Sequence, residues 1–376
     1  MSDDEVTPTA PGLGDKTPVA PGDDQERRRE GQGDPRSRLG EAMMPQGVEN
    51  LRPGQRLRGA LGNVFQLRKT WGAAGSYGSL WTATVVEGPL HDPARDETVA
   101  VKVLNQLEHG AAAAEYARSL DRGEHVVRGL DHSRVGDLVA FVAMQYLPGQ
   151  SLRDLVADDD YQVGRPLDTL ELADLLYAFA KALPRLYEQR GPARERSYHG
   201  DISPKNMVWH QPYGAERGRF VLVDLGHGHR DGSLATLTPS RARYVTPDMF
   251  PTAGQGVAPH PIYNDIHQAA QVILYALTGR HPTSSATARE DLDRLADLIP
   301  QNTPPELARL LRDMLTPDPR ERAERVPIQK VHKRLRSANL SLFQSPRRRS
   351  AKGVLPGGSS LTVSGRLLGV SKKFRQ

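Results

Sequence analysis

Apolar and polar residues follow two different patterns along this chain, one typical of strands and one typical of helices. Short segments rich in apolar, β-branched or aromatic residues predict strands at residues 64–71, 80–86, 98–104 and 138–146; polarity alternates in 98–104, and 138–146 is a continuous apolar run. Apolar positions at helical spacing, or long apolar runs, predict helices at residues 111–120, 169–190, 265–279 and 307–315. The expected strands therefore lie mainly in the first half of the chain and the expected helices in the second.

The two ends of the chain lack these patterns. Residues 1–54 are rich in Pro, Gly, Asp and Arg, and without apolar periodicity they are expected to be disordered. Residues 331–376 contain eleven Lys or Arg and no acidic residue, so 39 of the 50 basic residues and all 45 acidic ones precede residue 331. The net charge of +5 therefore comes from the C-terminal tail. Such a tail is either solvated or contacts an acidic partner: nucleic acid, acidic lipid or an acidic protein.

The composition excludes several kinds of site. The chain has no cysteine, which rules out disulfides, thiolate metal sites and cysteine nucleophiles. It has no apolar run of the roughly 18 residues that a membrane span needs, and its start does not resemble a signal peptide. These observations favour a cytoplasmic protein. The high content of Arg, Ala and Gly is typical of a GC-rich bacterial genome.

Three oxygen-bearing side chains are expected to share one site. Asp201 precedes Asn206 by five residues in a short loop with a Gly and a Pro, so both side chains can converge. Residues 220–223 predict a buried strand that ends at Asp224. This set suits phosphoryl transfer, in which one carboxylate accepts the substrate hydroxyl proton and a second carboxylate and an amide hold magnesium.

The loop at residues 199–206 resembles the His-Arg-Asp-x-x-x-x-Asn catalytic loop of eukaryotic-type (Hanks-type) serine/threonine protein kinases. Asp224-Leu225-Gly226 is similar to the Asp-Phe-Gly metal motif of the same family. The resemblance implies that Asp201 is the catalytic base and that Asn206 and Asp224 bind Mg²⁺.

Further motifs of this family occur in order before the loop. Residues 72–79 resemble the glycine-rich phosphate loop, with Ala73 in place of the first glycine, and Val99-Ala100-Val101-Lys102 resembles the Val-Ala-Ile-Lys strand. Glu115 is the expected ion-pair partner of Lys102, with Glu108 as the alternative, and residues 144–149 resemble the hinge that meets the adenine edge. The nucleotide-binding residues implied by the resemblance are Ala73, Gly75, Gly78, Leu80, Ala100, Lys102, Met144, Gln145 and Leu147.

Other motifs follow the loop. Residues 265–279 align without gaps to the helix Asp-x-Tyr-Ser-Leu-Gly-Val-x-Leu-Tyr-Glu-Leu-Leu-Thr-Gly of the family, in which the Asp accepts hydrogen bonds from the catalytic-loop backbone. Tyr244 to Asp248 resemble the end of the activation segment, and Arg322 stands where the family has an arginine that pairs with its last acidic residue, here Asp248.

The resemblance covers residues 64–335 and implies an α+β, bilobal protein-kinase-like fold with a small β-rich N-lobe and a larger helical C-lobe. We therefore expect a disordered segment at residues 1–60, a kinase domain at residues 61–335 and a disordered basic tail at residues 336–376. The N-lobe would cover about residues 61–147 and the C-lobe about 148–335. The implied activity is transfer of the ATP γ-phosphate, with Mg²⁺, to Ser or Thr of a protein substrate, with autophosphorylation as a further expectation.

Departures from the family pattern leave two alternatives open. Gly200 replaces the arginine that would bind a phosphorylated activation loop. Ser203 replaces a lysine that touches the γ-phosphate, and Lys205 is the nearest replacement. The His-Gly-Asp sequence and the missing lysine resemble the corresponding loops of aminoglycoside and choline phosphotransferases, which gives the first alternative function. The second alternative is a pseudokinase or nucleotide-binding scaffold. The Pro247-Asp248 ending, the helix at residues 265–279 and Arg322 favour a protein kinase over the phosphotransferases. The retention of Lys102, Asp201, Asn206 and Asp224 favours catalysis over a scaffold.

Overall fold

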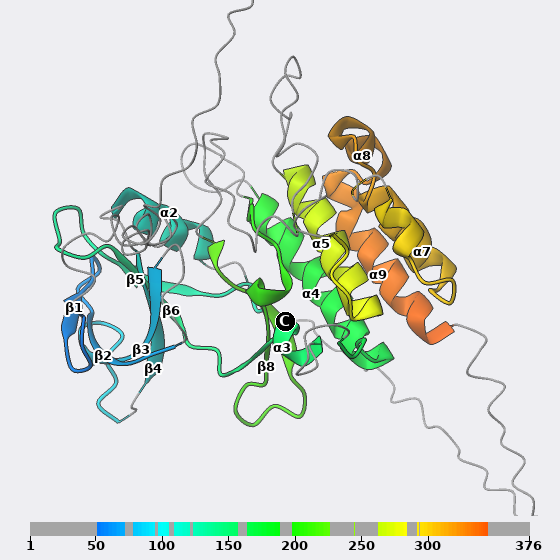
Figure 1. Ribbon diagram of the computed structural model, residues 1–376. Coiled ribbons are helices and arrows are strands. Elements are labelled where there is room, and N and C mark those ends of the chain that lie inside the picture. Colours follow the sequence, from blue (N-terminus) through cyan, green and yellow to red (C-terminus); the bar gives the residue numbers. More distant parts are fainter. Residues whose placement is uncertain are drawn as a thin grey trace, which may run out of the picture. The chain divides into compact units, whose positions relative to one another are not determined.

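The computed structural model describes eleven parts of the chain (Figure 1): residues 51–71, 78–94, 97–104, 109–120, 123–156, 164–188, 198–225, 244, 262–283, 292 and 294–344. As the sequence predicts, strands dominate the first half of the described residues and helices the second, which gives an α+β architecture.

The first half forms an antiparallel sheet of six strands in the order β1-β2-β3-β4-β6-β5. The strands are β1 (Arg56–Arg58), β2 (Val64–Thr70), β3 (Gly78–Glu87), β4 (Thr98–Leu104), β5 (Gly129–His132) and β6 (Phe141–Gln145). Because successive side chains of a strand point to opposite faces, Val101 and Val103 pack with Phe65 and Phe141 on one face. Ala100 and Lys102 share the other face of the sheet, on which helix α2 (His109–Ser119) packs against β5 and β6.

A second, three-stranded antiparallel sheet leads from the first sheet to the helices. It consists of β7 (Gly149–Ser151), β8 (Met207–His210) and β9 (Arg219–Leu222), in the order β7-β8-β9. The short helix α3 (Leu152–Val156) follows β7, and the 3₁₀ turn η1 (Pro204–Asn206) precedes β8. Asn206 lies directly before β8, and Asp224 lies two residues after the end of β9. Because Met207 and Leu222 are paired, these two strands hold Asn206 and Asp224 near the same edge of the sheet.

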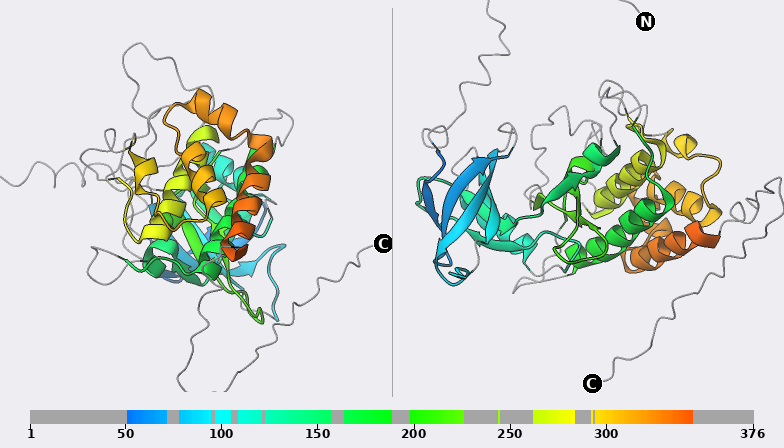
Figure 2. Two further views of the ribbon diagram at one scale, coloured as in Figure 1. Left: turned by 90° about the vertical axis from the view of Figure 1, so that its right-hand side faces the viewer. Right: turned by 90° about the horizontal axis from the view of Figure 1, so that it is seen from below.

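The second half is a group of helices around α5 (Figure 2). Helix α4 packs against α5 and α9, and α7 packs against α5 and α9. The helices are α4 (Thr169–Tyr187), α5 (Ile262–Thr278), η5 (Leu295–Leu298), α7 (Pro305–Met314), α8 (Pro319–Arg325) and α9 (Ile328–Gln344). Helix α5 is buried over most of its length: the run from Val272 to Ala276 is apolar, and the buried residues before it include Asp265 and Gln268.

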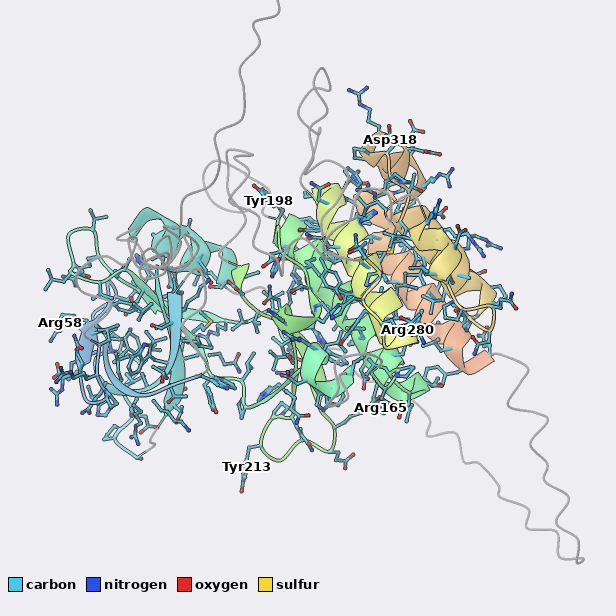
Figure 3. All side chains as sticks on the ribbon, in the orientation of Figure 1. Arg58, Arg165, Tyr198, Tyr213, Arg280 and Asp318 are labelled. Carbon is cyan, nitrogen blue, oxygen red and sulfur yellow. The ribbon has the colours of Figure 1, made fainter. Side chains whose placement is uncertain are left out.

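Local sequence signals explain where several helices begin. Asp168 accepts hydrogen bonds from the backbone N–H groups of Leu170 and Glu171, and the Glu171 side chain accepts from the Asp168 N–H, which completes a capping box for α4. Asp318, labelled in Figure 3, caps α8 in a similar way with Pro319 at the first helical position.

Backbone hydrogen bonds connect the first sheet region to the second sheet. The N–H of Val127 donates to Leu222 O (2.8 Å), and the N–H of Leu222 donates to His125 O (2.9 Å). The buried His125 ring lies 2.8 Å from Phe220 O, and burial lowers the pKa of this histidine. The segment before β5 is therefore paired directly with β9, the strand that ends just before Asp224.

The folded region is longer at both ends than the boundaries expected from the sequence. Strand β1 begins at Arg56, inside the range 1–60 that was expected to be disordered, because Leu57 is buried and the strand pairs with β2. Helix α9 continues to Gln344, past the expected boundary at 335, because Ala338 and Leu342 are buried. The remainder of the basic tail lies outside the described residues.

The strands β1, β5, β7 and β8 were not predicted, because their three or four residues contain neither a sustained alternation of polarity nor four consecutive apolar residues like residues 220–223, which predicted the equally short β9. Conversely, β6 begins at Phe141 rather than at residue 138, and Leu138 is exposed. Among the described residues no helix combines the length and the apolar character that a membrane span requires.

Candidate functional site

Lys102 lies at the centre of a group of three charged side chains. Its strand β4 is paired on both sides, so that Lys102 stands opposite Leu80 of β3 and Val142 of β6. The Nζ atom lies 3.2 and 3.1 Å from the two carboxylate oxygens of Glu115 and 2.5 Å from Oδ1 of Asp224. The structure therefore brings together residues from β4, from α2 and from the end of β9.

The charges of this group are strongly coupled. The side chains of Lys102 and Glu115 are 12% and 4% exposed, and that of Asp224 is 32% exposed. Burial by itself lowers the pKa of Lys102, but the carboxylates of Asp224 and Glu115 raise it well above its usual value. Lys102 is therefore protonated, and one ammonium group faces two carboxylates.

Asp224 has an uncommon backbone conformation. Its φ of 63° lies in the left-handed region, which a non-glycine residue enters only at a cost. The preceding residue is held on both sides, since the N–H of Val223 donates to Asn206 O (2.9 Å) and Val223 O accepts from the His199 ring (2.9 Å). These bonds hold the chain where it turns to direct the Asp224 carboxylate toward Lys102.

The loop that carries Asp201 is closed by Asn206. The amide nitrogen Nδ2 of Asn206 donates to the backbone oxygen of Asp201 (2.8 Å) and to its carboxylate oxygen Oδ2 (3.3 Å). The nitrogen is thus used within the loop, and the oxygen is the atom of this amide that can act as a metal ligand. A carboxylate and an amide oxygen are hard donors of the kind that Mg²⁺ prefers, and protein sites often supply only one or two such groups beside substrate phosphates.

His199 connects this loop to the segment before Asp224. The backbone N–H of Asp201 donates to Nδ1 of the His199 ring (3.1 Å), which assigns the ring proton to Nε2, the atom that donates to Val223 O. The sequence interpretation gave His199 no separate role. Its motif position was recognised, but only the folded chain shows that its ring joins two backbone segments.

Asp265 supports the same loop from α5. Its two carboxylate oxygens accept the backbone N–H groups of His199 (2.7 Å) and Gly200 (2.8 Å), which is the contact expected from the sequence. The carboxyl is fully buried, and burial raises its pKa to about 7 although the two hydrogen bonds act in the opposite direction. Gly200 has a φ of 77°, a conformation that glycine adopts without the steric cost of a Cβ.

The remaining predicted residues fall into two groups. Ala100 and Met144 are buried and stand opposite each other in the β4–β6 register, Leu147 is buried, and Gln145 is exposed. Gly78 approaches β4 so closely that a Cβ there would lie 1.9 Å from Val103 O. Ala73 and Gly75 lie outside the described residues.

Arg322 is fully buried and donates hydrogen bonds to the backbone oxygens of Tyr263, Thr316 and Pro317. Its expected partner, Asp248, lies outside the described residues, as does Gly226. The guanidinium therefore has a clear structural function beside α5 and α8.

Comparison with solved structures relates this geometry to known proteins. The kinase domain of PknI from Mycobacterium tuberculosis matches with a TM-score of 0.51 at 20% sequence identity, over 77% of this chain and 99% of that domain. The chain has the protein kinase fold. A double mutant of the PknI kinase domain matches at 20% identity and a TM-score of 0.49, over 78% of this chain and 99% of the other. No protein-family model and no curated protein sequence matches this chain.

The match confirms the expected protein-kinase-like fold and its bilobal α+β class. The six-stranded sheet with α2 corresponds to the N-lobe, and the three-stranded sheet with the helices corresponds to the C-lobe. In this frame Lys102 and Glu115 belong to the N-lobe, and the loop with Asp201 belongs to the C-lobe.

Proposed function

We propose that this protein is an ATP- and Mg²⁺-dependent protein kinase that transfers the γ-phosphate to Ser or Thr hydroxyl groups. The observation that carries the proposal is the contact of Lys102 with both Glu115 and Asp224. One N-lobe cation thereby faces the C-lobe carboxylate that would bind metal, next to the loop that holds Asp201 and Asn206.

Asp201 is proposed as the base. Hydrogen bonding from Asn206 restrains the Asp201 carboxylate, which would orient the substrate hydroxyl and accept its proton. Lys102 would bind the α- and β-phosphates and Glu115 would hold the ammonium in place. The Asn206 oxygen and the Asp224 carboxylate would hold Mg²⁺, which neutralises phosphate charge when bound.

The adenine base would lie near Leu80, Ala100 and Met144, with Leu147 at the hinge. The N–H of Gln145 already donates to Arg128 O (2.8 Å), so a nucleotide contact from Gln145 would use its carbonyl group. Gly78, together with Ala73 and Gly75, would cover the phosphates. This assignment follows the family pattern and gives each of these residues a separate role.

The γ-phosphate contact would come from Lys205 rather than from residue 203. Ser203 is buried, and its carbonyl accepts the N–H of Asn206 (3.0 Å), so this short side chain belongs to the interior of the loop. Lys205 is exposed in η1 between Asp201 and Asn206, and its longer side chain suits a phosphate contact.

Radiolabelled ATP distinguishes this proposal from its rivals. Purified protein is incubated with Mg²⁺ and labelled ATP, and separately with a generic protein acceptor or an aminoglycoside. Label in phosphoserine or phosphothreonine of the acceptor, or of the kinase itself, is the expected result. Label in the aminoglycoside would identify a small-molecule phosphotransferase, and ATP binding without any transfer would identify a nucleotide-binding scaffold.

A further inference from the structure

Helix α5 carries a second buried polar side chain one turn after Asp265. Gln268 is 2% exposed. Its oxygen Oε1 accepts the backbone N–H of Ile202 (3.0 Å), and its nitrogen Nε2 donates to the backbone oxygen of Tyr244 (2.8 Å). One amide group therefore joins the residue next to Asp201 to the segment that follows Asp224.

The side chain of Tyr244 is held at its other end. Its hydroxyl lies 3.0 Å from Nδ1 of His281, and the His281 ring stacks on Tyr275 of α5 with ring centroids 4.8 Å apart. Tyr244 is 3% exposed. Gln268 at the backbone and His281 at the hydroxyl thus attach Tyr244 to α5 and to the residues just after it.

The chemistry of Gln268 suits a connecting role better than a packing role. Burial of an amide in an apolar helix is costly unless both its donor and its acceptor are used, and here both are used by backbone groups. The family motif has a serine at this position, and a serine side chain is too short to reach two separate backbone segments. A methionine or leucine would fill the same space but would remove this partner from both the N–H of Ile202 and the carbonyl of Tyr244.

We propose that Gln268 is a positioning residue that couples the Tyr244 segment to the loop carrying Asp201. A displacement of Tyr244 would pull on the Gln268 amide and release the N–H of Ile202, beside the catalytic carboxylate. The inference rests on the proposed kinase function for its catalytic consequence, but the mechanical coupling itself is independent of catalysis.

Amide hydrogen exchange of Ile202 measures the coupling directly. In Gln268→Met this amide loses its acceptor and is expected to exchange about tenfold faster, because a net hydrogen bond accounts for roughly that factor. Gln271→Met is the matched control: Gln271 is equally buried three residues further along α5, and its amide faces His267 (2.8 Å) instead of the loop. Equal Ile202 exchange in the two variants would overturn the proposal.

A double-mutant cycle tests transmission from Tyr244. Tyr244→Phe removes the hydroxyl contact with His281, and it should speed Ile202 exchange when Gln268 is present but add nothing in the Gln268→Met background. Additive effects would show that the two residues act separately and would overturn the proposal. If Gln268→Met does not fold, Tyr244→Phe in the wild-type background still decides the coupling: unchanged Ile202 exchange in that single variant would overturn the proposal.

Steady-state kinetics of the same variants test whether the coupling affects the proposed activity. Gln268→Met is expected to lower kcat about tenfold and leave the KM for ATP unchanged, whereas Gln271→Met should leave both unchanged. A reduced kcat with slow Ile202 exchange would contradict the coupling. If the wild-type protein transfers no phosphate, the proposed function fails while the exchange measurements still decide the coupling.

Discussion

The two halves of the site are held in place by different means. Lys102 lies in a strand paired on both sides, so its position follows from the register of β3, β4 and β6. The loop with Asp201 has no such ladder and depends on a few buried side chains, chiefly His199, Asp265 and Gln268. Many equivalent backbone hydrogen bonds between strands therefore position Lys102 in the N-lobe. Individual buried polar side chains position the Asp201 loop in the C-lobe.

This difference predicts how substitutions act. A change in the packing around Lys102 should cost stability and leave the position of the lysine intact, because the backbone ladder remains. A substitution of a polar residue that holds the C-lobe loop should lower activity strongly even where it lowers the free energy of unfolding only a little. The predictions below test this contrast, beginning with the largest expected effect.

Asp201→Asn is expected to reduce kcat by a factor of about 10² to 10⁴, the usual contribution of a general base. Asparagine has nearly the shape of aspartate, so ATP binding should change little. Initial rates with labelled ATP and calorimetric titration of nucleotide measure the two effects. A variant that retains the wild-type rate would exclude Asp201 as the base.

Lys102→Met should lower the free energy of unfolding by about 3 kcal/mol, because the carboxylates of Glu115 and Asp224 would remain close together without their cation. Urea denaturation measures the loss. Adding Glu115→Gln to the same protein removes one of the two negative charges and should restore part of the stability. A double variant less stable than Lys102→Met would contradict this electrostatic explanation.

Asp265→Asn should cost about 2 kcal/mol, because both oxygens of a carboxyl, ionised or protonated, can accept a backbone N–H, whereas the amide nitrogen of asparagine cannot accept and directs its own donor at one of them. The cost should depend on pH. In the folded protein the pKa of Asp265 is about 7, above the ordinary value of 3.8, so the folded state binds this proton more tightly. The contribution of Asp265 is complete below about pH 4 and is lost as pH rises through 7.

The stability gap between wild type and Asp265→Asn should therefore be larger at pH 5 than at pH 8, since asparagine does not titrate. Urea denaturation of both proteins at the two pH values measures it. A gap that widens toward pH 8 would mean that the ionised carboxylate is the form that the folded state prefers.

Val101→Ala provides the contrast in the N-lobe. Val101 is fully buried on the face of β4 opposite to Lys102, and the lost packing should cost about 2 kcal/mol. The KM for ATP and kcat should stay close to wild type at a temperature where the variant is folded. A large change in KM would show that side-chain packing, and not strand register, positions Lys102.

The long elements were predictable because they repeat their pattern many times. Strand β4 and helix α4 begin where the sequence predicts, and the C-terminal end of α5 lies within one residue of its expected end. The strands β1 and β8 have three and four residues and gave no usable pattern. The length of α9 was also missed, because a basic composition concealed the apolar residues on its buried face.

Residues of the candidate site could be predicted from the sequence only where they stand at the characteristic spacing of a motif. The motif positions indicated Asp201, Asn206 and Asp224, and the structure places Asn206 in contact with Asp201. Gln268 was missed, because one amide in an apolar helix gives no signal of what it faces. The only available signal was its place three residues after Asp265, on the same side of the helix.

The amino-acid sequence alone determined the order of the longer strands and helices, the kinase-like motifs and the residue types at the candidate site, since these depend on local periodicity and spacing. The tertiary structure decided which groups meet: Lys102 with Asp224, 122 residues apart, and Gln268 with both Ile202 and Tyr244. The physical reason is that strand and helix preferences act over a few residues. Contacts between distant groups depend instead on how whole elements pack, and on the need to satisfy every polar group that this packing buries.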